Sequence, residues 1–280
     1  MSDSNARDSQ VSAPSTYVFD DPDNPVSARF PALAADFDAG TIRHLAAIGV
    51  GAGSRCLEVG GGGGSIAAWL SSRVGPTGHV LVTDIDTHFL ESMNLPHTEI
   101  RRHDIVTDPL PKASFDFVHV RLVLLHVHER EQALANMIAA LKPGGWLLGE
   151  DFDVSVSPDP SLDSGETLST TYLAMTRIMT ERGVDRMFGR RLFGRFQALG
   201  LVDVGAEGRS FMWSAGSPGP ALMRTNFEQL RADMIAAGYV TEDEFEHDLA
   251  ALGNADFRMP SPVLWAAWGR KRADSTTLAQ

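Results

Sequence analysis

Five consecutive glycines, Gly60 to Gly64, form the part of the sequence best suited to binding a ligand. The residues before them, LEV, end an apolar run typical of a buried strand, and the residues after them, SIAAWL, favour a helix. Glycine costs conformational entropy on folding, so we expect this run where the backbone approaches another group closely. The G-x-G-x-G loop predicts a ligand lying on the backbone at the positive end of a helix dipole.

Three carboxylates accompany this loop. Glu58 lies two residues before the first glycine, where it can interact, directly or through water, with a ligand ammonium group. Asp84 ends the next expected strand, where a carboxylate can accept hydrogen bonds from both hydroxyls of a ribose, and Asp104 follows the third, where one can accept from an adenine amino group. An amino acid joined to adenosine satisfies all three. The glycines alone also fit a dinucleotide, and each aspartate alone also fits a helix or turn cap.

Strand-forming and helical segments alternate from about residue 54, which predicts an α/β fold with a parallel sheet between helices. The expected strands span 54–59, 79–84, 98–103, 115–120 and 145–151, with later strands over 201–213 and 263–269. The expected helices span 65–74, 129–141 and 190–199, with further helical stretches around 172–179 and 227–235. The two late strands predict seven strands in one sheet, with the last strand antiparallel.

The chain divides by composition into five segments. We expect a disordered lead over 1–16, an N-terminal helical cap over 17–50 and a cofactor-binding half over 51–153. A substrate-side half with helical insertions around the sixth strand follows over 154–270, and a flexible tail over 271–280.

Five motifs follow one another along residues 57–153: LEVGGGGGSIAAWL, VLVTDID, RRHDI, FDFVHVRLVLLHV and LKPGGWLLGEDFD. Together they resemble the class I S-adenosylmethionine-dependent methyltransferases, most closely the UbiE-like group and small-molecule methyltransferases of bacterial secondary metabolism. The resemblance implies a Rossmann-like sheet of order 3-2-1-4-5-7-6, the cofactor S-adenosyl-L-methionine and the product S-adenosyl-L-homocysteine. It also implies the residues of the cofactor site: Glu58, Gly60, Gly62, Asp84, Ile85, Asp104, Ile105 and Arg121.

Ligands of open sheets bind beyond the carboxyl ends of the strands, which gives five candidates for the chemistry: His126, His128, Glu150, Asp151 and Asp153. Of these, His126 and Asp151 are the candidate catalytic residues. An imidazole titrates near neutral pH, so His126 is the first candidate for a base, although it also fits a packed strand–helix interface. Alternation along the fifth strand predicts that Asp151 and Asp153 point to the same side, toward the substrate. Tyr17, Tyr172 and Asp153 are the candidate acceptor-binding residues, although aromatic side chains occur as often in plain cores.

Charge and composition limit the partners. A net charge of −12 argues against a nucleic-acid partner. The sequence has no run of about 18 apolar residues, so we expect no membrane span. The single cysteine, Cys56, excludes an intrachain disulfide and suits a cytoplasmic location. We expect no metal, because His126 and His128 are better explained as a loop-to-helix junction. We expect His119 to be structural, and a homodimer stays open.

The sequence therefore predicts transfer of a methyl group from S-adenosyl-L-methionine to a small, fairly hydrophobic, natural-product-like acceptor, with a hydroxyl as the first expectation. The sequence does not distinguish this reaction from methylation at carbon, as on a quinone, or at nitrogen. An NAD-dependent oxidoreductase is an alternative, although the chain has no Tyr-x-x-x-Lys pair and Glu58 would sit close to a pyrophosphate. A cofactor-binding module without catalysis is the other alternative.

Overall fold

The computed structural model describes residue 19, residues 26–155 and residues 169–273. Its centre is a seven-stranded sheet of order β3-β2-β1-β4-β5-β9-β6. The strands are β1 (Arg55–Val59), β2 (His79–Asp84), β3 (Thr98–Arg102), β4 (Phe115–Arg121), β5 (Leu141–Asp153), β6 (Val202–Arg209) and β9 (Val263–Arg270). The strands from β3 to β5 pair in parallel, and β9 is antiparallel to both of its neighbours. The predicted fold class and strand order are confirmed, with β9 as the seventh strand of the sheet.

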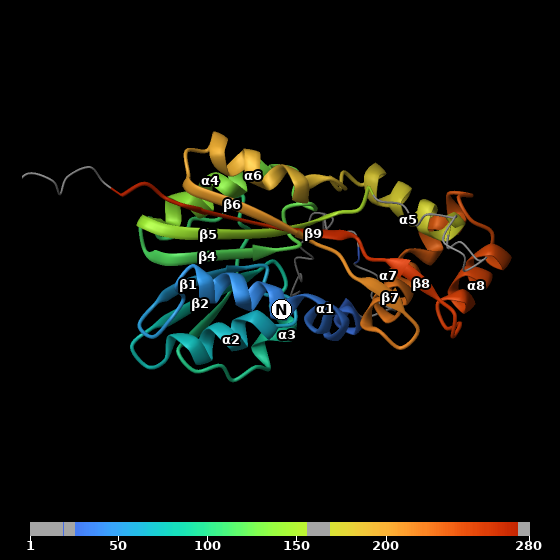
Figure 1. The fold of residues 1–280 in the computed structure, drawn as a ribbon, viewed down its shortest axis with the longest axis horizontal. Coiled ribbons are helices and arrows are strands. Elements are labelled where there is room, and N and C mark those ends of the chain that lie inside the picture. Colours follow the sequence, from blue (N-terminus) through green and yellow to red (C-terminus); the bar gives the residue numbers. More distant parts are fainter. Residues whose placement is uncertain (1–18, 20–25, 156–168, 274–280) are drawn as a thin grey trace, which may run out of the picture.

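Helices cover both faces of the sheet (Figure 1). They are the 3-10 helix η1 (Val26–Arg29), α1 (Phe30–Ala47), α2 (Ser65–Val74), α3 (His88–Glu91), α4 (Arg130–Ala140), α5 (Ser169–Glu181), α6 (Phe188–Ala198), α7 (Pro218–Ala236) and α8 (Glu242–Ala251). Helices α4 and α6 pack on one face, and α2 packs on the other with the end of α1. Because both faces are covered, central strands bury side chains on both sides, as in β1, where Cys56, Leu57, Glu58 and Val59 are all buried.

Two strand expectations need correction. The segment 201–213 forms two strands, because the chain leaves the sheet after Arg209. The N–H of Ser261 donates to the carbonyl of Phe211 at 2.7 Å, and β7 (Met212–Ser214) pairs with β8 (Arg258–Pro260) as a separate ribbon. Strand β5 begins at Leu141 rather than at residue 145, because Leu141 pairs with Phe115 before a register shift.

A helical layer stands beyond the carboxyl ends of the strands. Helix α5 packs against α7 and α8, and α1 packs against α7, with the β7–β8 ribbon beside them (Figure 1). The expected helical insertions are therefore present on both sides of β6. Helix α8 begins with a capping box between Thr241 and Glu244.

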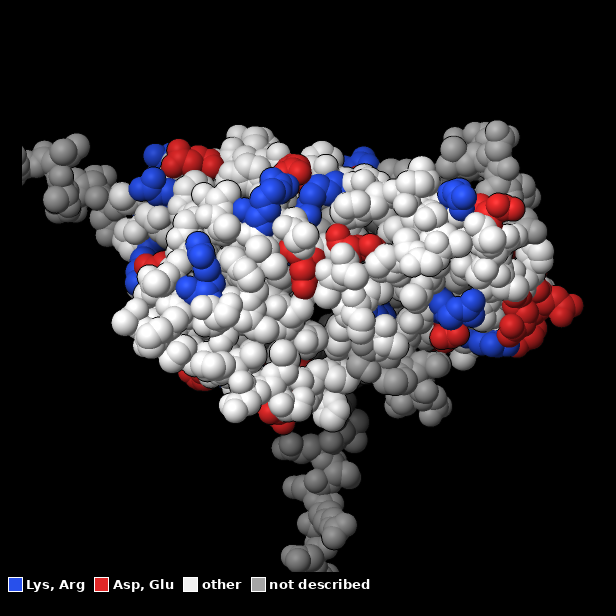
Figure 2. Space-filling model, turned by 60° about the horizontal axis from the view of Figure 1, so that its bottom comes forward, with Lys and Arg blue, Asp and Glu red and all other residues white. Residues whose placement is uncertain are grey.

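The surface carries charges of both signs. On the face in Figure 2, Lys and Arg are interspersed with Asp and Glu over a mainly uncharged surface. The described part of this face therefore offers no continuous basic track of the kind that follows a phosphate backbone. None of the helices built from the described residues has the length and apolar composition needed to cross a membrane.

Candidate active site

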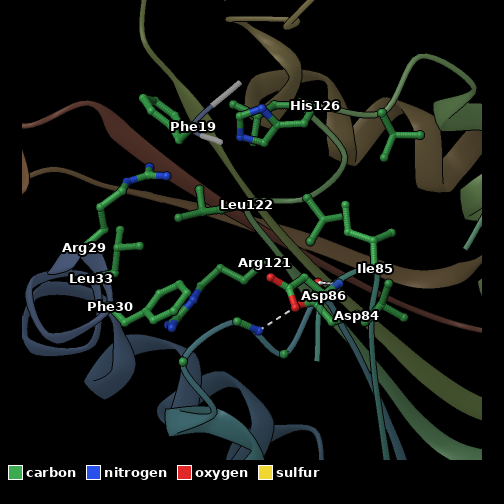
Figure 3. Close-up of a pocket in the computed structure, with 18 of the residues that line it drawn as sticks. Phe19, Arg29, Phe30, Leu33, Asp84, Ile85, Asp86, Arg121, Leu122 and His126 are labelled. Carbon is green, nitrogen blue, oxygen red and sulfur yellow. Dashed lines mark hydrogen bonds between the residues drawn. The ribbon is translucent and has the colours of Figure 1, made fainter. Parts of the chain in front are cut away.

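A cavity of about 1480 Å³ opens where the strands end and the helical layer begins. Pockets that enclose one drug-sized ligand typically measure about 300–1,000 Å³, so this cavity has room for two ligands side by side. Its strand-end half is lined by the glycine loop and by residues after β2, β3 and β4. Its helical half is lined by residues from η1, α1, α5 and α7, from the end of β5 and from β7. Figure 3 shows part of this lining.

Two constraints explain the glycines of the loop. Gly60 has φ +72° and Gly62 has φ +50°, in the left-handed region that disfavours side chains. A Cβ added to Gly60 would lie 2.2 Å from a methyl group of Val123, and one added to Gly63 would lie 2.6 Å from Phe30. The loop is therefore held close to other parts of the protein, and its backbone also faces the cavity.

Asp84 points at this loop. Its Oδ2 accepts from the backbone N–H of Gly62 at 2.9 Å, drawn as a dashed line in Figure 3, and its Oδ1 accepts from that of Asp86 at 3.2 Å. Burial raises the pKa of the Asp84 carboxyl above its usual range, against the effect of these hydrogen bonds. Asp84 thus joins the end of β2 to the glycine loop at the edge of the cavity.

The other three residues predicted for the adenosine end also line the strand-end half of the cavity: Ile85, Asp104 and Ile105. Asp104 accepts from the N–H of Val106 at 2.8 Å, which fixes the turn after β3. Ile85 is 47% exposed, unusual for a large apolar residue, and Ile105 is buried. All three line the cavity, as do Gly60, Gly62 and Asp84.

Glu58 and Arg121 bring opposite charges to the cavity. Glu58 is 4% exposed, and its Oε2 contacts Nδ1 of His119 at 2.9 Å. Arg121 donates to Thr41 Oγ1 at 2.9 Å and to Asp38 Oδ1 at 2.7 Å, both on α1. Every residue predicted for the cofactor site thus lines this one cavity, and the individual roles stay predictions.

His119, expected to be structural, lies among charged groups next to the cavity. It lies on β4 between Glu58 of β1 and Glu150 of β5, and it is 1% exposed. Burial alone would lower the pKa of its imidazole, but the two carboxylates outweigh burial and raise this pKa to about 9. We call Glu58, His119, Glu150, Thr41 and Arg121 the His119 network. An acid and a histidine on adjacent strands, Glu58 and His119, were the signal available in the sequence.

His126 lines the helical half and is 9% exposed. Burial, followed by the charges of Arg29 and Arg130, lowers the pKa of its imidazole to about 3. The ring of Phe19 meets it edge-on, with centroids 6.2 Å apart. At neutral pH this imidazole is uncharged, so it can orient a hydroxyl, but its low pKa makes it a weak base.

Asp151 and Asp153 lie on the side of β5 opposite to the one we expected. The cavity is lined instead by their neighbours Phe152 and Val154. Asp151 is fully buried. Helix α6 packs closely against it, because a Cβ added to Gly189 would lie only 2.1 Å from the backbone carbonyl oxygen of Asp151. Asp153 is 2% exposed and pairs with Arg190 of α6. The alternation was right, but the packing of α6 decides which side of β5 faces the cavity, and neither Asp151 nor Asp153 lines it.

Tyr172 is buried, lines the helical half as expected, and has its pKa raised by burial. Tyr17 lies outside the described residues. Asn226 on α7, which was not predicted, lines the cavity and is 9% exposed. Its Oδ1 has no hydrogen-bond partner among the described residues. A single asparagine within a helical segment gives no signal in the sequence. The described residues contain no group of His, Cys, Asp and Glu arranged to hold a metal ion.

Comparison with known proteins connects this site to a family. A family model described as a methyltransferase domain matches residues 57–149. Methyltransferase str2 of Strobilurus tenacellus is 30% identical over 151 residues, which are 53% of this chain and 54% of that protein. The ubiquinone/menaquinone biosynthesis C-methyltransferase UbiE of Pseudomonas putida is 36% identical over 112 residues, which are 37% of this chain and 44% of that protein. The chain thus spans about half the length of the curated relatives it matches.

The fold is similar to that of a solved methyltransferase. Phosphoethanolamine N-methyltransferase 2 of Haemonchus contortus, in complex with phosphomonomethylethanolamine and S-adenosylhomocysteine, superposes with a TM-score of 0.58 at 15% identity. The superposition covers 94% of this chain and 61% of that chain, and it shows a shared fold. Residues 57–149 are thus similar to a methyltransferase domain, within a chain that shares its fold with a solved methyltransferase.

Proposed function

We propose that the chain transfers the methyl group of S-adenosyl-L-methionine to a small, fairly hydrophobic acceptor. The observation that carries this proposal is the continuity of one cavity. Its strand-end half presents glycine backbone and carboxylates, and its helical half is largely apolar. The cofactor supplies a methyl group already activated by its sulfonium, so the contribution of the chain is to hold two ligands in line.

The strand-end half supplies a partner for each part of the cofactor. Glu58 would bind its ammonium group, and Arg121 would border its carboxylate. Asp84 would accept hydrogen bonds from the ribose hydroxyls, and Asp104 from the adenine amino group. Two apolar residues would flank the adenine ring: Ile85 and Ile105. S-Adenosyl-L-homocysteine, the product, has the same groups and is therefore a suitable probe.

The helical half favours an apolar acceptor that carries a hydroxyl. Its wall is rich in methionine and aromatic side chains, which suit adaptable apolar contacts: Met175, Met179, Met223, Tyr172 and Trp213. Asn226 Oδ1 and the uncharged imidazole of His126 can accept hydrogen bonds from hydroxyl groups. We therefore propose oxygen as the methylated atom, with His126 orienting the acceptor rather than removing its proton. A cytoplasmic location is part of the same proposal, supported by the single cysteine.

Calorimetric titration of the purified protein with S-adenosyl-L-homocysteine, beside NAD and NADP, tests the cofactor. We expect micromolar binding of the first ligand alone. Binding of NAD alone would contradict the proposal and favour the oxidoreductase.

Labelled S-adenosyl-L-methionine, offered with hydroxylated aromatic, polyketide-like and quinone acceptors, tests the transfer itself. We expect an O-methyl product, and NMR of the product identifies the methylated atom. A product methylated at carbon or nitrogen would overturn the choice of oxygen alone. Cofactor binding without any product would favour the non-catalytic module.

A further inference from the structure

The His119 network is a continuous chain of contacts that joins Glu58 to Arg121. His119 contacts Glu58 Oε2 through Nδ1 at 2.9 Å and Glu150 Oε2 through Nε2 at 3.4 Å. Thr41 donates to the same Glu150 oxygen at 2.5 Å, and Arg121 donates to Thr41 at 2.9 Å. Glu58 and Arg121 line the cavity, whereas the three residues between them do not.

The two carboxylates that flank His119 favour an imidazolium. A neutral imidazole carries a hydrogen on one ring nitrogen only, so its other nitrogen would face a carboxylate oxygen with no hydrogen between them. The protonated ring donates in both directions and places one positive charge between two buried carboxylates. Buried charges are tolerated only when they are paired and hydrogen-bonded, and each carboxylate meets this condition through His119.

Charged groups from neighbouring elements surround this histidine. Besides Glu58 and Glu150, they are Arg121 on the same strand and Arg209 of β6, which donates to Glu150 Oε1 at 2.8 Å. On α1, His44 interacts electrostatically with Glu150. Arg209 thus pairs directly with Glu150, whereas Arg121 reaches Glu150 through Thr41 and pairs with Asp38 of α1 at 2.7 Å. His119 is the cation in contact with Glu58.

We propose that His119 is a positioning residue that does not touch the cofactor. It orients Glu58 and, through Glu150 and Thr41, Arg121, and these two residues would meet the zwitterionic end of the cofactor. The inference rests on the proposed function, because it takes S-adenosyl-L-methionine as the ligand. It assigns to one buried histidine the alignment of both charges that meet the amino-acid group. The adenosine end, held by Asp84 and Asp104, lies outside this network.

The test compares two ligands on wild-type protein and on His119→Gln. S-Adenosyl-L-homocysteine carries the ammonium and carboxylate, and 5′-methylthioadenosine lacks both. We expect His119→Gln to weaken binding of S-adenosyl-L-homocysteine by about tenfold, within the usual range of coupling between sites, and to change 5′-methylthioadenosine binding by less than twofold. His247→Gln, at an exposed histidine of α8, is the matched control and should leave both affinities unchanged.

Glu150→Gln gives a second reading if His119→Gln folds poorly. It keeps the shape of the side chain, lies outside the cavity, and should also weaken S-adenosyl-L-homocysteine selectively, by about fivefold. The pH profile adds a third reading. The wild-type affinity for S-adenosyl-L-homocysteine should fall as pH rises through about 9, more steeply than in His119→Gln. Deprotonation of the ligand amine is common to both proteins and cancels in this comparison.

The outcomes separate the two proposals. If the wild type fails to bind S-adenosyl-L-homocysteine, the proposed function fails and the inference fails with it. If the wild type binds it and both variants bind within twofold, the inference alone is overturned. Equal weakening of both ligands would also overturn it, because a general loss of structure would then explain the effect.

Discussion

Two buried histidines, seven positions apart in the chain, mark the difference between the halves of the cavity. His119 lies behind the strand-end half between two carboxylates, which raise its pKa to about 9. His126 lies in the wall of the helical half near two arginines, and burial and these charges lower its pKa to about 3. The first is a fixed charge and the second is an uncharged polar group. A charged histidine thus lies behind the strand-end half, and an uncharged histidine lines the helical half.

The chain segments that form each half differ in the same way. The strand-end half is built by the ends of β1 to β4 and the loops that directly follow them, within residues 58–123. The helical half is assembled from residues as far apart as Phe19, Phe152, Tyr172, Asn226 and Pro262. Substitutions in the first half should therefore affect cofactor binding, and substitutions in the second should affect the acceptor and leave the cofactor in place.

The largest effect should follow from Asp84→Ala. This change removes two charge-assisted hydrogen bonds to the ribose, each worth roughly 1.5–3 kcal/mol, so S-adenosyl-L-homocysteine should bind about 100-fold more weakly or worse. Calorimetry measures this loss, and circular dichroism checks that the fold is intact. Asp84→Asn can still accept from Gly62 and should lose less. An affinity within twofold of wild type would remove Asp84 from the proposed site.

Acid should destabilise the folded protein through His126. Its pKa is about 3 in the folded protein and lies near 6.5 in the unfolded chain. Acidification below pH 6.5 therefore protonates the unfolded state first. The wild type should lose roughly 3 kcal/mol more unfolding free energy than His126→Leu between pH 7 and pH 4. Urea unfolding of both proteins at each pH measures the difference, and parallel curves would show that His126 is not held neutral.

Alkali should destabilise the protein through His119, whose pKa is raised rather than lowered. Its folded pKa of about 9 lies above the unfolded value, so its stabilisation is complete below pH 6.5 and is lost as pH rises through 9. Between pH 7 and pH 10 the unfolding free energy of the wild type should fall by roughly 2–3 kcal/mol more than that of His119→Gln. The same urea experiment without any ligand checks this, and an unchanged difference across the range would contradict the charged state.

The smallest effect should come from Asn226→Leu. The change replaces an amide whose Oδ1 has no partner among the described residues, so unfolding free energy should rise by about 1 kcal/mol. A hydroxylated acceptor should lose one neutral hydrogen bond, which raises its KM by about 2- to 10-fold. Calorimetry should show S-adenosyl-L-homocysteine affinity within twofold of wild type. A clear loss of that affinity would mean that the two halves are not separate.

The comparison also explains which residues could be predicted from the sequence. In a parallel sheet the carboxyl ends of the strands meet at one edge, so Glu58, Asp84 and Asp104 had to converge once their strands were recognised. Asp151 and Asp153 could be placed on one side of β5, but α6, contributed by a later part of the chain, decided what that side faces. Asn226 reaches the cavity only because α7 packs beside α5 and α1. Such contacts between distant segments leave no local pattern.

The position of β9 has a consequence for how the chain folds during synthesis. β9 lies between β5 and β6 and pairs with both, although both precede it in the chain. Until residues 263–270 emerge from the ribosome, β5 has an open edge and β6 has no place in the sheet. Unpaired strand edges invite intermolecular pairing, so the nascent protein is most exposed to aggregation while residues 154–262 are being translated. Slow decoding of that stretch should lower the yield of folded protein, whereas slow decoding after residue 270 should not.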